Sequence, residues 1–239
     1  MKFEMNSDYS LLRKEIKYII PLQKAMSIKK SLDNLLPKDM YNENGIYTVK
    51  SLYFDSVNNT DFSEKIMGTE SRKKVRLRTY NENDSLCKME LKEKTGDWQQ
   101  KQGFLISKPD AEGLLYGNFS VLKNYFGHNE TSIKIYSIVM LGRYRPVVLI
   151  RYDRIAYQYP MYDTRITLDM NIGASESNLN LFSKWCNSTP VMHEKAILEI
   201  KYSGKLMGFI SSVLGQFGLT QGAYSKYCSA RRNYYDFNY

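Results

Sequence analysis

The chain has 239 residues, 43% of them hydrophobic and 25% charged, so it can bury a core and has the composition of an ordinary globular protein. No apolar run approaches the roughly 20 residues that a membrane-crossing helix needs, and the first ten residues lack the apolar region of a signal peptide. Three scattered cysteines and two histidines fit neither a disulfide framework nor a zinc finger. These features exclude a membrane channel and predict a soluble, cytoplasmic protein with no transmembrane segment.

The charge balance indicates an anionic partner. Lysine and arginine number 34 against 25 aspartates and glutamates, which gives a net charge of +9 and a pI near 9.2. A basic balance of this size suits a nucleic acid, a membrane surface or a phosphate compound. Composition does not choose among the three, so the positions of the charges along each predicted element have to decide.

Hydrophobic spacing predicts an alternation of strands and helices in which strands are the majority. The chain shows no internal repeat and no low-complexity linker, so we expect a single domain over residues 1–239. In chain order we expect a strand over 12–20, a helix over 22–36, strands over 47–54, 71–80, 86–94 and 101–106, helices over 109–116, 119–126 and 132–142, strands over 145–159, 163–170 and 195–202, and helices over 205–217 and 224–233.

Charged residues occupy one face of each predicted strand, because side chains alternate between the two faces. On the strand near residue 75, for example, Arg76 and Arg78 oppose Val75 and Leu77. The charged faces carry twelve cations and four carboxylates: Arg13, Lys17, Arg72, Lys74, Arg76, Arg78, Lys88, Lys92, Lys94, Arg154, Arg165 and Lys201 against Glu15, Glu90, Asp169 and Glu199.

Two architectures fit this pattern. One is an open antiparallel sheet with a solvated face and a helix-covered face. The other is a closed barrel whose charged faces line the interior and whose apolar faces meet helices. The excess of cations favours the barrel, because concentrated positive charge in a narrow space is suited to a polyanion. The few carboxylates suit a divalent metal ion that carboxylate and phosphate oxygens share. Ion pairing with neighbouring cations is the simpler interpretation for Glu90 and Asp169.

Several stretches together resemble a known family. They are Arg-Lys-Glu-Ile-Lys-Tyr at 13–18, Ser-Leu-Tyr-Phe-Asp at 51–55, Arg-Lys-Lys-Val-Arg-Leu-Arg-Thr-Tyr at 72–80, Glu-Leu-Lys-Glu-Lys at 90–94, Tyr-Asp-Arg at 152–154, Asp-Thr-Arg-Ile-Thr-Leu-Asp at 163–169, Leu-Glu-Ile-Lys-Tyr at 198–202 and Tyr-Ser-Lys-Tyr at 224–227. In this order they resemble the catalytic domain of the vacuolar transporter chaperone (VTC) complex. That domain is a polyphosphate polymerase of the triphosphate tunnel metalloenzyme superfamily.

The resemblance implies an α+β fold: a closed eight-stranded antiparallel β-barrel, or tunnel, with helices packed outside and a C-terminal helix at one end. It also implies cytoplasmic exposure, ATP and inorganic polyphosphate as partners rather than nucleic acid, and Mn²⁺ or Mg²⁺ as cofactor. Position by position, it implies that the catalytic phosphate ligands are Lys17, Arg76, Arg78, Lys92, Arg154 and Arg165. Glu199 is then the metal ligand, and the substrate-binding candidates are Tyr152, Ser225 and Lys226, to which the charged faces add Lys94 and Lys201.

One departure from the pattern of hydrolytic relatives helps to choose between polymerase and hydrolase. Hydrolytic relatives begin with Glu-x-Glu-x-Lys, whereas this chain has Arg13 at the first position. We therefore expect a polymerase that transfers the γ-phosphate of ATP to a growing polyphosphate chain. The alternatives are a tunnel-type triphosphatase or pyrophosphatase, which uses water as acceptor, and a non-catalytic polyphosphate-binding module, which would have no use for Glu199.

Overall fold

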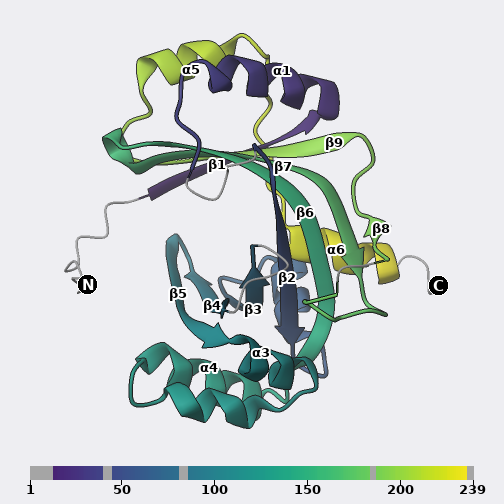
Figure 1. The fold of residues 1–239 in the computed structure, drawn as a ribbon. Helices are drawn as coiled ribbons and strands as arrows, with labels where there is room; N and C mark the ends of the chain where they lie inside the picture. The colour runs from purple at the N-terminus through teal and green to yellow at the C-terminus, as the bar shows by residue number, and fades with distance from the viewer. Residues whose placement is uncertain (1–12, 40–44, 81–85, 184–186, 236–239) are drawn as a thin grey trace. The chain divides into compact units, whose positions relative to one another are not determined.

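The computed structural model describes residues 13–39, 45–80, 86–183 and 187–235 (Figure 1). Its strands are β1 (Arg13–Pro21), β2 (Tyr47–Asp55), β3 (Ser71–Thr79), β4 (Leu86–Thr95), β5 (Trp98–Ser107), β6 (Arg145–Tyr159), β7 (Thr164–Ser175), β8 (Thr189–Pro190) and β9 (Lys195–Ser203). Its helices are α1 (Leu22–Asp33), α2 (Thr60–Met67), α3 (Lys108–Leu115), α4 (Glu130–Leu141), α5 (Gly208–Gly215) and α6 (Lys226–Tyr235), with 3-10 turns η1 (Phe119–Tyr125) and η2 (Met161–Asp163).

The described strands form an antiparallel sheet in the order β1-β9-β7-β6-β2-β3-β4-β5, and the short β8 pairs with β7. This confirms the expected α+β class and its antiparallel sheet. The order has two ends, β1 and β5, so within the described ranges no strand pairing closes the sheet into the expected eight-stranded barrel.

The chain divides into two compact units, each assembled from separate stretches. The first unit comprises Met1–Ile46, Arg154–Met170 and Glu194–Tyr224, and the second comprises Tyr47–Asp153, Asn171–His193 and Ser225–Tyr239. Strands β6 and β7 contribute residues to both units. The single domain expected from the sequence stays a prediction.

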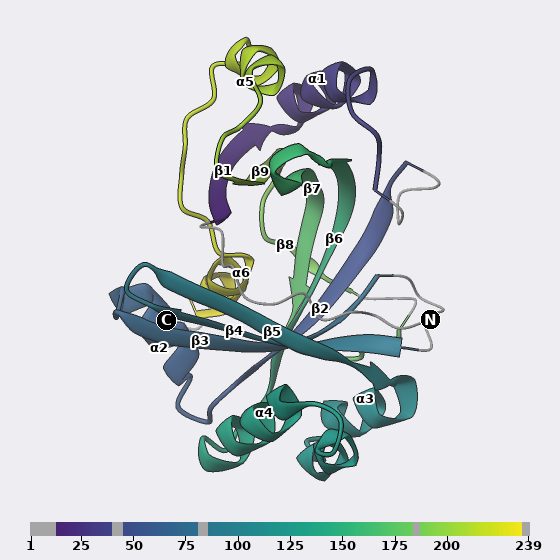
Figure 2. The same cartoon turned by 90° about the vertical axis from the view of Figure 1, so that its left-hand side faces the viewer.

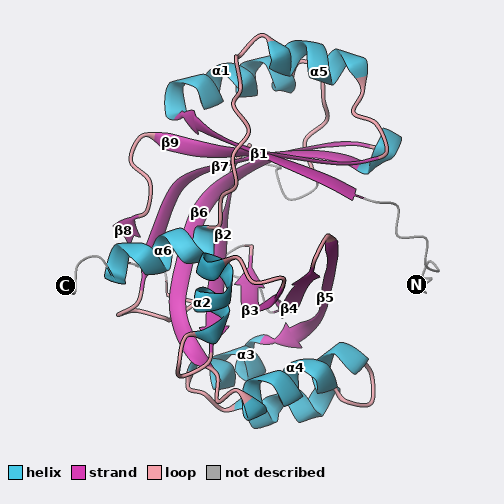
Figure 3. Cartoon of the chain, turned by 180° about the vertical axis from the view of Figure 1, so that it is seen from behind, coloured by secondary structure: helices cyan, strands magenta, loops and turns pink. Residues whose placement is uncertain are grey.

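In the first unit, helices α1 and α5 cover one face of strands β1, β9 and β7 (Figures 1 and 3). The core between them contains Ile28 and Leu32 of α1, Leu198 and Ile200 of β9, and Ile210 of α5, all buried. These strand residues alternate with charged ones, so burial of the apolar face leaves the charged face on the opposite side of the strands. The alternation predicted from the sequence is confirmed for this unit.

In the second unit, α3, η1 and α4 cover one face of strands β3, β4 and β5 (Figure 2). Leu77, Leu91 and Phe104 point into this core from the three strands, and Leu114 and Ile135 meet them from α3 and α4. Each fully buried apolar side chain of this size contributes about 1.5–3 kcal/mol to folding. The opposite face of these strands again carries the charged side chains.

Helix α2 was not expected from the sequence, because its start is fixed by a residue outside it. The carboxylate of Asp55, at the end of β2, accepts hydrogen bonds from the backbone N–H groups of Ser56, Asp61 and Phe62. It thereby satisfies donors that the first turn of a helix leaves unpaired. The helix ends at Gly68, whose φ of 73° is the left-handed conformation that glycine adopts without strain.

Strand β7 runs five residues beyond the expected end at residue 170. Asn171 lies inside it with a left-handed backbone (φ 50°), a conformation that asparagine tolerates better than most residues. Its side-chain amide donates a hydrogen bond to Asp153 over 2.8 Å. Because this residue interrupts the regular pleat, the alternating pattern ends there in the sequence although the strand does not. The other expected elements are present, with ends that differ by a few residues and with η1 in the 3-10 form.

Candidate functional site

The charged side of β3, β4 and β5 in the second unit, called the cationic face below, sets like charges directly opposite one another. Its charged side chains are Arg72, Lys74, Arg76, Arg78, Lys88, Lys92, Lys94 and Lys101, with Glu90 as the carboxylate among them. In one cross-strand row Lys74 stands opposite Lys92, which stands opposite Lys101. Like charges in this position destabilise a sheet, so the arrangement favours an anionic ligand that would neutralise them.

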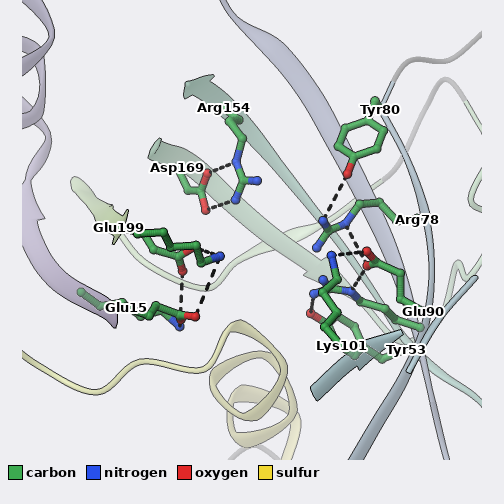
Figure 4. A network of polar contacts seen from close by, with 12 residues as sticks. Glu15, Tyr53, Arg78, Tyr80, Glu90, Lys101, Arg154, Asp169 and Glu199 are labelled. Atoms are coloured by element: carbon green, nitrogen blue, oxygen red, sulfur yellow. Dashed lines mark hydrogen bonds and ion pairs between the residues drawn. The ribbon is translucent and has the colours of Figure 1, made fainter. Parts of the chain in front are cut away.

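Glu90 is the centre of the cationic face, as Figure 4 shows. It is 1% exposed, lies 2.6 Å from Arg76 Nε and 3.8 Å from Arg78 Nε, and also pairs with Lys101. Burial opposes ionisation of this carboxyl, but Arg76, Arg78 and Lys101 hold its pKa far below the usual range. The ion pairing expected for Glu90 is confirmed. Opposite it stands Gly103, where a Cβ would come within 2.6 Å of the Met89 carbonyl, so glycine permits this close packing.

Two tyrosines fix the outer ends of the arginines. Arg76 Nη1 donates a hydrogen bond to the Tyr53 hydroxyl over 3.1 Å, and Arg78 Nη1 donates to the Tyr80 hydroxyl over 3.3 Å. Alternation along the strand did not single out Tyr53, because almost every residue of β2 is buried and the period-two signal is absent there.

The start of α6 brings the predicted substrate-binding residues of the second unit together. Lys74 Nζ donates to Ser225 Oγ over 2.8 Å, and the same oxygen accepts a hydrogen bond from the backbone N–H of Cys228. The ammonium group of Lys226 lies 4.7 Å from the ring centre of Tyr152, a cation–π distance. The predicted residues Lys92 and Lys94 lie on the cationic face, half-buried.

The charged side of β1, β9, β7 and β6 in the first unit, called the balanced face below, sets cations opposite carboxylates between β1 and β9, while Arg165 of β7 stands opposite Lys201. Lys17 lies 2.6 Å from Glu15 and 3.4 Å from Glu199, and Lys201 lies 2.5 Å from Glu199 and 3.9 Å from Glu15 (Figure 4). Lys17 is opposite Glu199 and Glu15 opposite Lys201 in the strand register. Burial lowers the pKa of Lys17, but Glu199 and Glu15 together raise it above the ordinary value.

The two predicted arginines of this face each hold a carboxylate. Arg154 makes a bidentate pair with Asp169, with Nε–Oδ1 of 2.6 Å and Nη2–Oδ2 of 2.8 Å. Arg165 Nη2 lies 2.7 Å from Asp39, which comes from the segment that follows α1. The ion pairing expected for Asp169 is confirmed, and both arginines are oriented by protein carboxylates.

The balanced face offers oxygen ligands to a divalent cation. No cluster of three His, Cys, Asp or Glu side chains capable of holding a metal occurs among the described residues. Glu15 and Glu199 supply two carboxylates, and Thr167, opposite Glu199 in the register, is 3% exposed with a hydroxyl oxygen that has no hydrogen-bond partner. Hard cations of the Mg²⁺ type take one or two carboxylates and complete their shell with phosphate and water. The residues fit such an ion.

Glu15 and Asp39 were not among the predicted ligands, and Lys101 was considered from the sequence only as a cation that could line the phosphate path. Lys101 and Glu15 lie on strands where alternation places them on the charged side, but their ion pairs depend on the register between strands. Asp39 lies outside any helix or strand core, and only the folded chain brings it to Arg165.

Comparison with solved structures identifies the fold. A Hippeastrum protein assigned as an adenylyl cyclase, and described as having a dominant triphosphatase activity, matches with a TM-score of 0.61 and 13% identity over 92% of this chain and 95% of that one. A protein of Bacillus halodurans assigned as an adenylate cyclase matches with a TM-score of 0.51 and 13% identity over 89% of this chain and 95% of that one. At this level of identity the likeness shows a shared fold.

The family follows from sequence. The family profile described as "VTC domain" matches residues 12–235, nearly the whole chain. The protein therefore belongs to the VTC domain family, which confirms the resemblance seen in the ordered motifs. A search of curated proteins gave no match. Among the described residues, no helix has both the length and the apolar character required to cross a membrane.

Proposed function

We propose that this protein is a metal-dependent polyphosphate polymerase that transfers the γ-phosphate of ATP to the end of a growing polyphosphate chain. The observation that carries the proposal is the cationic face, on which eight cations accompany one carboxylate over three adjacent strands. A face that met only water would gain stability by alternating its charges, as the balanced face does between β1 and β9. Membership of the VTC domain family supports the same substrate class.

In this proposal the cationic face holds the phosphates. Arg76 and Arg78 supply planar guanidinium groups, which bind phosphate oxygens through two N–H groups at once. Lys92 and Lys94 act as point charges farther along β4, and Lys226 adds one at the start of α6. Ser225 and Tyr152 would contribute hydroxyl groups beside them. The closed tunnel expected from the sequence is part of this proposal. In such a tunnel the product chain would move along the cationic face.

In this proposal the balanced face supplies the metal ligands and the remaining phosphate ligands. Glu199, with Glu15 and Thr167 beside it, would hold Mn²⁺ or Mg²⁺, which supplies charge neutralisation at the phosphate oxygens when it is bound. Lys17 and Lys201 hold the two carboxylates in place, and their ammonium groups would contact phosphate oxygens with a cation bound at the carboxylates. Arg154 and Arg165, aligned by Asp169 and Asp39, are further phosphate ligands.

The proposed reaction needs no side-chain nucleophile. A terminal oxygen of the polyphosphate chain attacks the γ-phosphorus of ATP, the bond from that phosphorus to the β–γ bridging oxygen breaks, and ADP leaves with the bond electrons. Phosphoryl transfer depends mainly on positioning and on stabilising charge at the phosphate oxygens. The lysines and arginines meet both requirements.

The second candidate is a triphosphatase, for which water replaces polyphosphate as the acceptor. The dominant triphosphatase activity described for the Hippeastrum protein of similar fold supports it. The two activities require the same phosphate and metal ligands and differ in what reaches the γ-phosphorus. Arg13, in place of the carboxylate that hydrolytic relatives carry, favours the polymerase.

Product analysis separates the candidates. The protein is incubated with ATP and Mn²⁺ or Mg²⁺, and ADP, orthophosphate and polyphosphate are measured at the same time points. We expect ADP in proportion to phosphate residues incorporated into long-chain polyphosphate, with little orthophosphate. Orthophosphate equal to ADP would establish the triphosphatase, and binding of polyphosphate without turnover would leave a binding module. Glu199→Gln serves as the inactive control for contaminating ATPases.

A further inference from the structure

The two arginines at the centre of the cationic face are held from two sides. Nε of Arg76 lies 2.6 Å from Glu90, and Nε of Arg78 lies 3.8 Å from the same carboxylate. On the other side, Nη1 of each arginine donates to a tyrosine hydroxyl, of Tyr53 at 3.1 Å and of Tyr80 at 3.3 Å. Two of the three nitrogens of each guanidinium therefore have fixed partners in the protein.

The third nitrogen of each guanidinium is directed elsewhere. Nη2 of Arg76 and Nη2 of Arg78 make no hydrogen bond with any residue in the described part of the chain. The side chains are 19% and 8% exposed, and neither Nη2 is among the fully buried atoms that lack a partner, so a ligand arriving from solvent can reach both. A rigid planar donor with one free amino edge is arranged for an acceptor that arrives from outside the protein, and phosphate oxygen is such an acceptor.

Tyr53 is itself held by the C-terminal helix. It is 6% exposed, and its ring stacks on that of Tyr227 from α6, with centroids 5.0 Å apart and planes 22° from parallel. The hydroxyl of Tyr227 donates a hydrogen bond to Asp55, the carboxylate that also starts helix α2. A continuous series of contacts thus runs from Asp55 through Tyr227 and Tyr53 to Arg76. Tyr80 makes a tilted ring contact with Tyr47, with centroids 6.2 Å apart, and is more exposed than Tyr53.

We propose that Tyr53 and Tyr80 are positioning residues that direct the free amino groups of Arg76 and Arg78 toward phosphate, and that Tyr53 couples this direction to the docking of α6. The inference rests on the proposed function, because it requires the cationic face to bind phosphate. Tyr53 has the larger effect of the two, since its hydrogen bond is shorter and its ring is packed.

Ionisation of the Tyr53 phenol makes the proposed positioning role depend on pH. The groups that face it are Lys74, Arg76 and Arg78 from β3 and the ring of Tyr227 from α6. Burial raises the pKa of Tyr53, but the three cations together lower it to about 8. Above that pH the ionised phenol pairs with Arg76 and repels phosphate, so phosphate binding weakens as pH rises through 8. A merely structural tyrosine would show no such dependence.

The test compares Tyr53→Phe and Tyr80→Phe with the wild type, using inorganic tripolyphosphate as the probe and calorimetry at pH 7 and pH 9. Tyr53→Phe keeps the stacked ring and removes the hydroxyl. We expect its affinity at pH 7 to be about tenfold weaker than wild type, and that of Tyr80→Phe about threefold weaker, as for lost hydrogen bonds to a charged group. At pH 9 the Tyr53→Phe deficit shrinks, because the wild-type phenol is then ionised.

The control is Tyr125→Phe. This substitution also removes a phenol hydroxyl that makes hydrogen bonds, to Asp110 and from the Ser107 backbone, but on the helix-covered side of the strands. We expect it to leave affinity and pH profile unchanged. Burial lowers the pKa values of Lys74 and Lys101, and Tyr53 partly offsets this for Lys74, so Tyr80→Phe and Tyr125→Phe, which keep Tyr53, serve as the references in which Lys74 titrates as in the wild type.

The outcomes separate this inference from the proposed function. If the wild type binds tripolyphosphate and Tyr53→Phe matches it at both pH values, the positioning role is overturned and the proposed function stands. Equal losses in Tyr53→Phe and Tyr125→Phe would also overturn it, since the effect would then be general. A wild type that fails to bind tripolyphosphate would overturn the proposed function and this inference together.

Discussion

The cationic face and the balanced face are built on strands of the same sheet, but they compensate charge in opposite ways. On the balanced face Lys17 stands opposite Glu199 and Glu15 opposite Lys201, so β1 and β9 attract each other, although Arg165 of β7 stands opposite Lys201. On the cationic face the cross-strand neighbours of Lys92 are Lys74 and Lys101, which repel it. Opposite charges therefore stabilise the pairing of β1 with β9, whereas β3, β4 and β5 carry an excess of cations that the proposed function assigns to a ligand.

Removing the central carboxylate of the balanced face should have the largest effect. Glu199→Gln keeps the size of the side chain and removes its charge, so we expect metal-dependent turnover of ATP to fall at least about a hundredfold, beyond the loss of one charge-assisted contact. Steady-state assays over a range of Mn²⁺ concentrations would measure it. Glu93→Gln is the matched control, because Glu93 pairs with Lys134 on the helix-covered side of β4. Near-normal turnover in Glu199→Gln would exclude the metal site.

Removing an arginine from the cationic face should lower turnover about tenfold or more. In Arg76→Ala a charge-assisted contact to phosphate is lost, which costs about 1.5–3 kcal/mol. Arg76→Lys keeps the charge without the planar fork and should retain part of the activity. Unchanged turnover in Arg76→Ala would contradict the assignment of this face to phosphate.

Arg76→Ala should also reduce stability, because Glu90 loses one of its three cationic partners. A buried carboxylate deprived of one of three partners destabilises the fold by roughly 1–3 kcal/mol. The folded pKa of Glu90 lies below its ordinary value of 4.5, so its ionised form contributes stability above that pH, and this contribution is lost as pH falls through the folded pKa. In Arg76→Ala that pKa rises, and we expect acid unfolding to begin at higher pH. Denaturant unfolding at several pH values would measure both effects.

Neutralising one lysine on each face should change stability in opposite directions, by the smallest amounts. Lys201→Gln removes a partner of Glu199 and Glu15 and should lower the free energy of unfolding by up to about 1 kcal/mol. Lys94→Gln removes a charge that stands opposite Arg72 and should raise it by a few tenths of a kcal/mol. Both changes should shrink in high salt. If both variants changed the free energy of unfolding in the same direction at low salt, the distinction between the two faces would be contradicted.

The sequence predicts the charged faces well because alternation along a strand is a local property. It placed Arg76 and Arg78 opposite Val75 and Leu77, and the structure buries both apolar residues. It also identified Glu90 as a partner of cations. What it could not provide is the register between strands, which brings Lys101 to the same carboxylate from β5.

Contacts between distant segments explain the elements and site residues that the sequence did not predict. Helix α2 depends on Asp55 at the end of the preceding strand, and a short helix without its own capping side chain leaves a weak periodic signal. Tyr53 lies on a strand buried on both sides, where alternation carries no information. Asp39 reaches Arg165 across more than a hundred residues of sequence, so only the fold could pair them.

Binding of tripolyphosphate with and without Mn²⁺ tests most directly the claim that the two faces have different roles. Calorimetry on the wild type, Glu199→Gln and Arg76→Ala would give the affinity and the gain that the metal adds. We predict that Glu199→Gln keeps the metal-free affinity, or improves it because Lys17 and Lys201 lose a competing carboxylate, and shows no gain with Mn²⁺. Arg76→Ala should lose metal-free affinity about tenfold or more and keep the gain. If Glu199→Gln and Arg76→Ala lost metal-free affinity and the gain with Mn²⁺ to the same extent, the two faces would not have different roles.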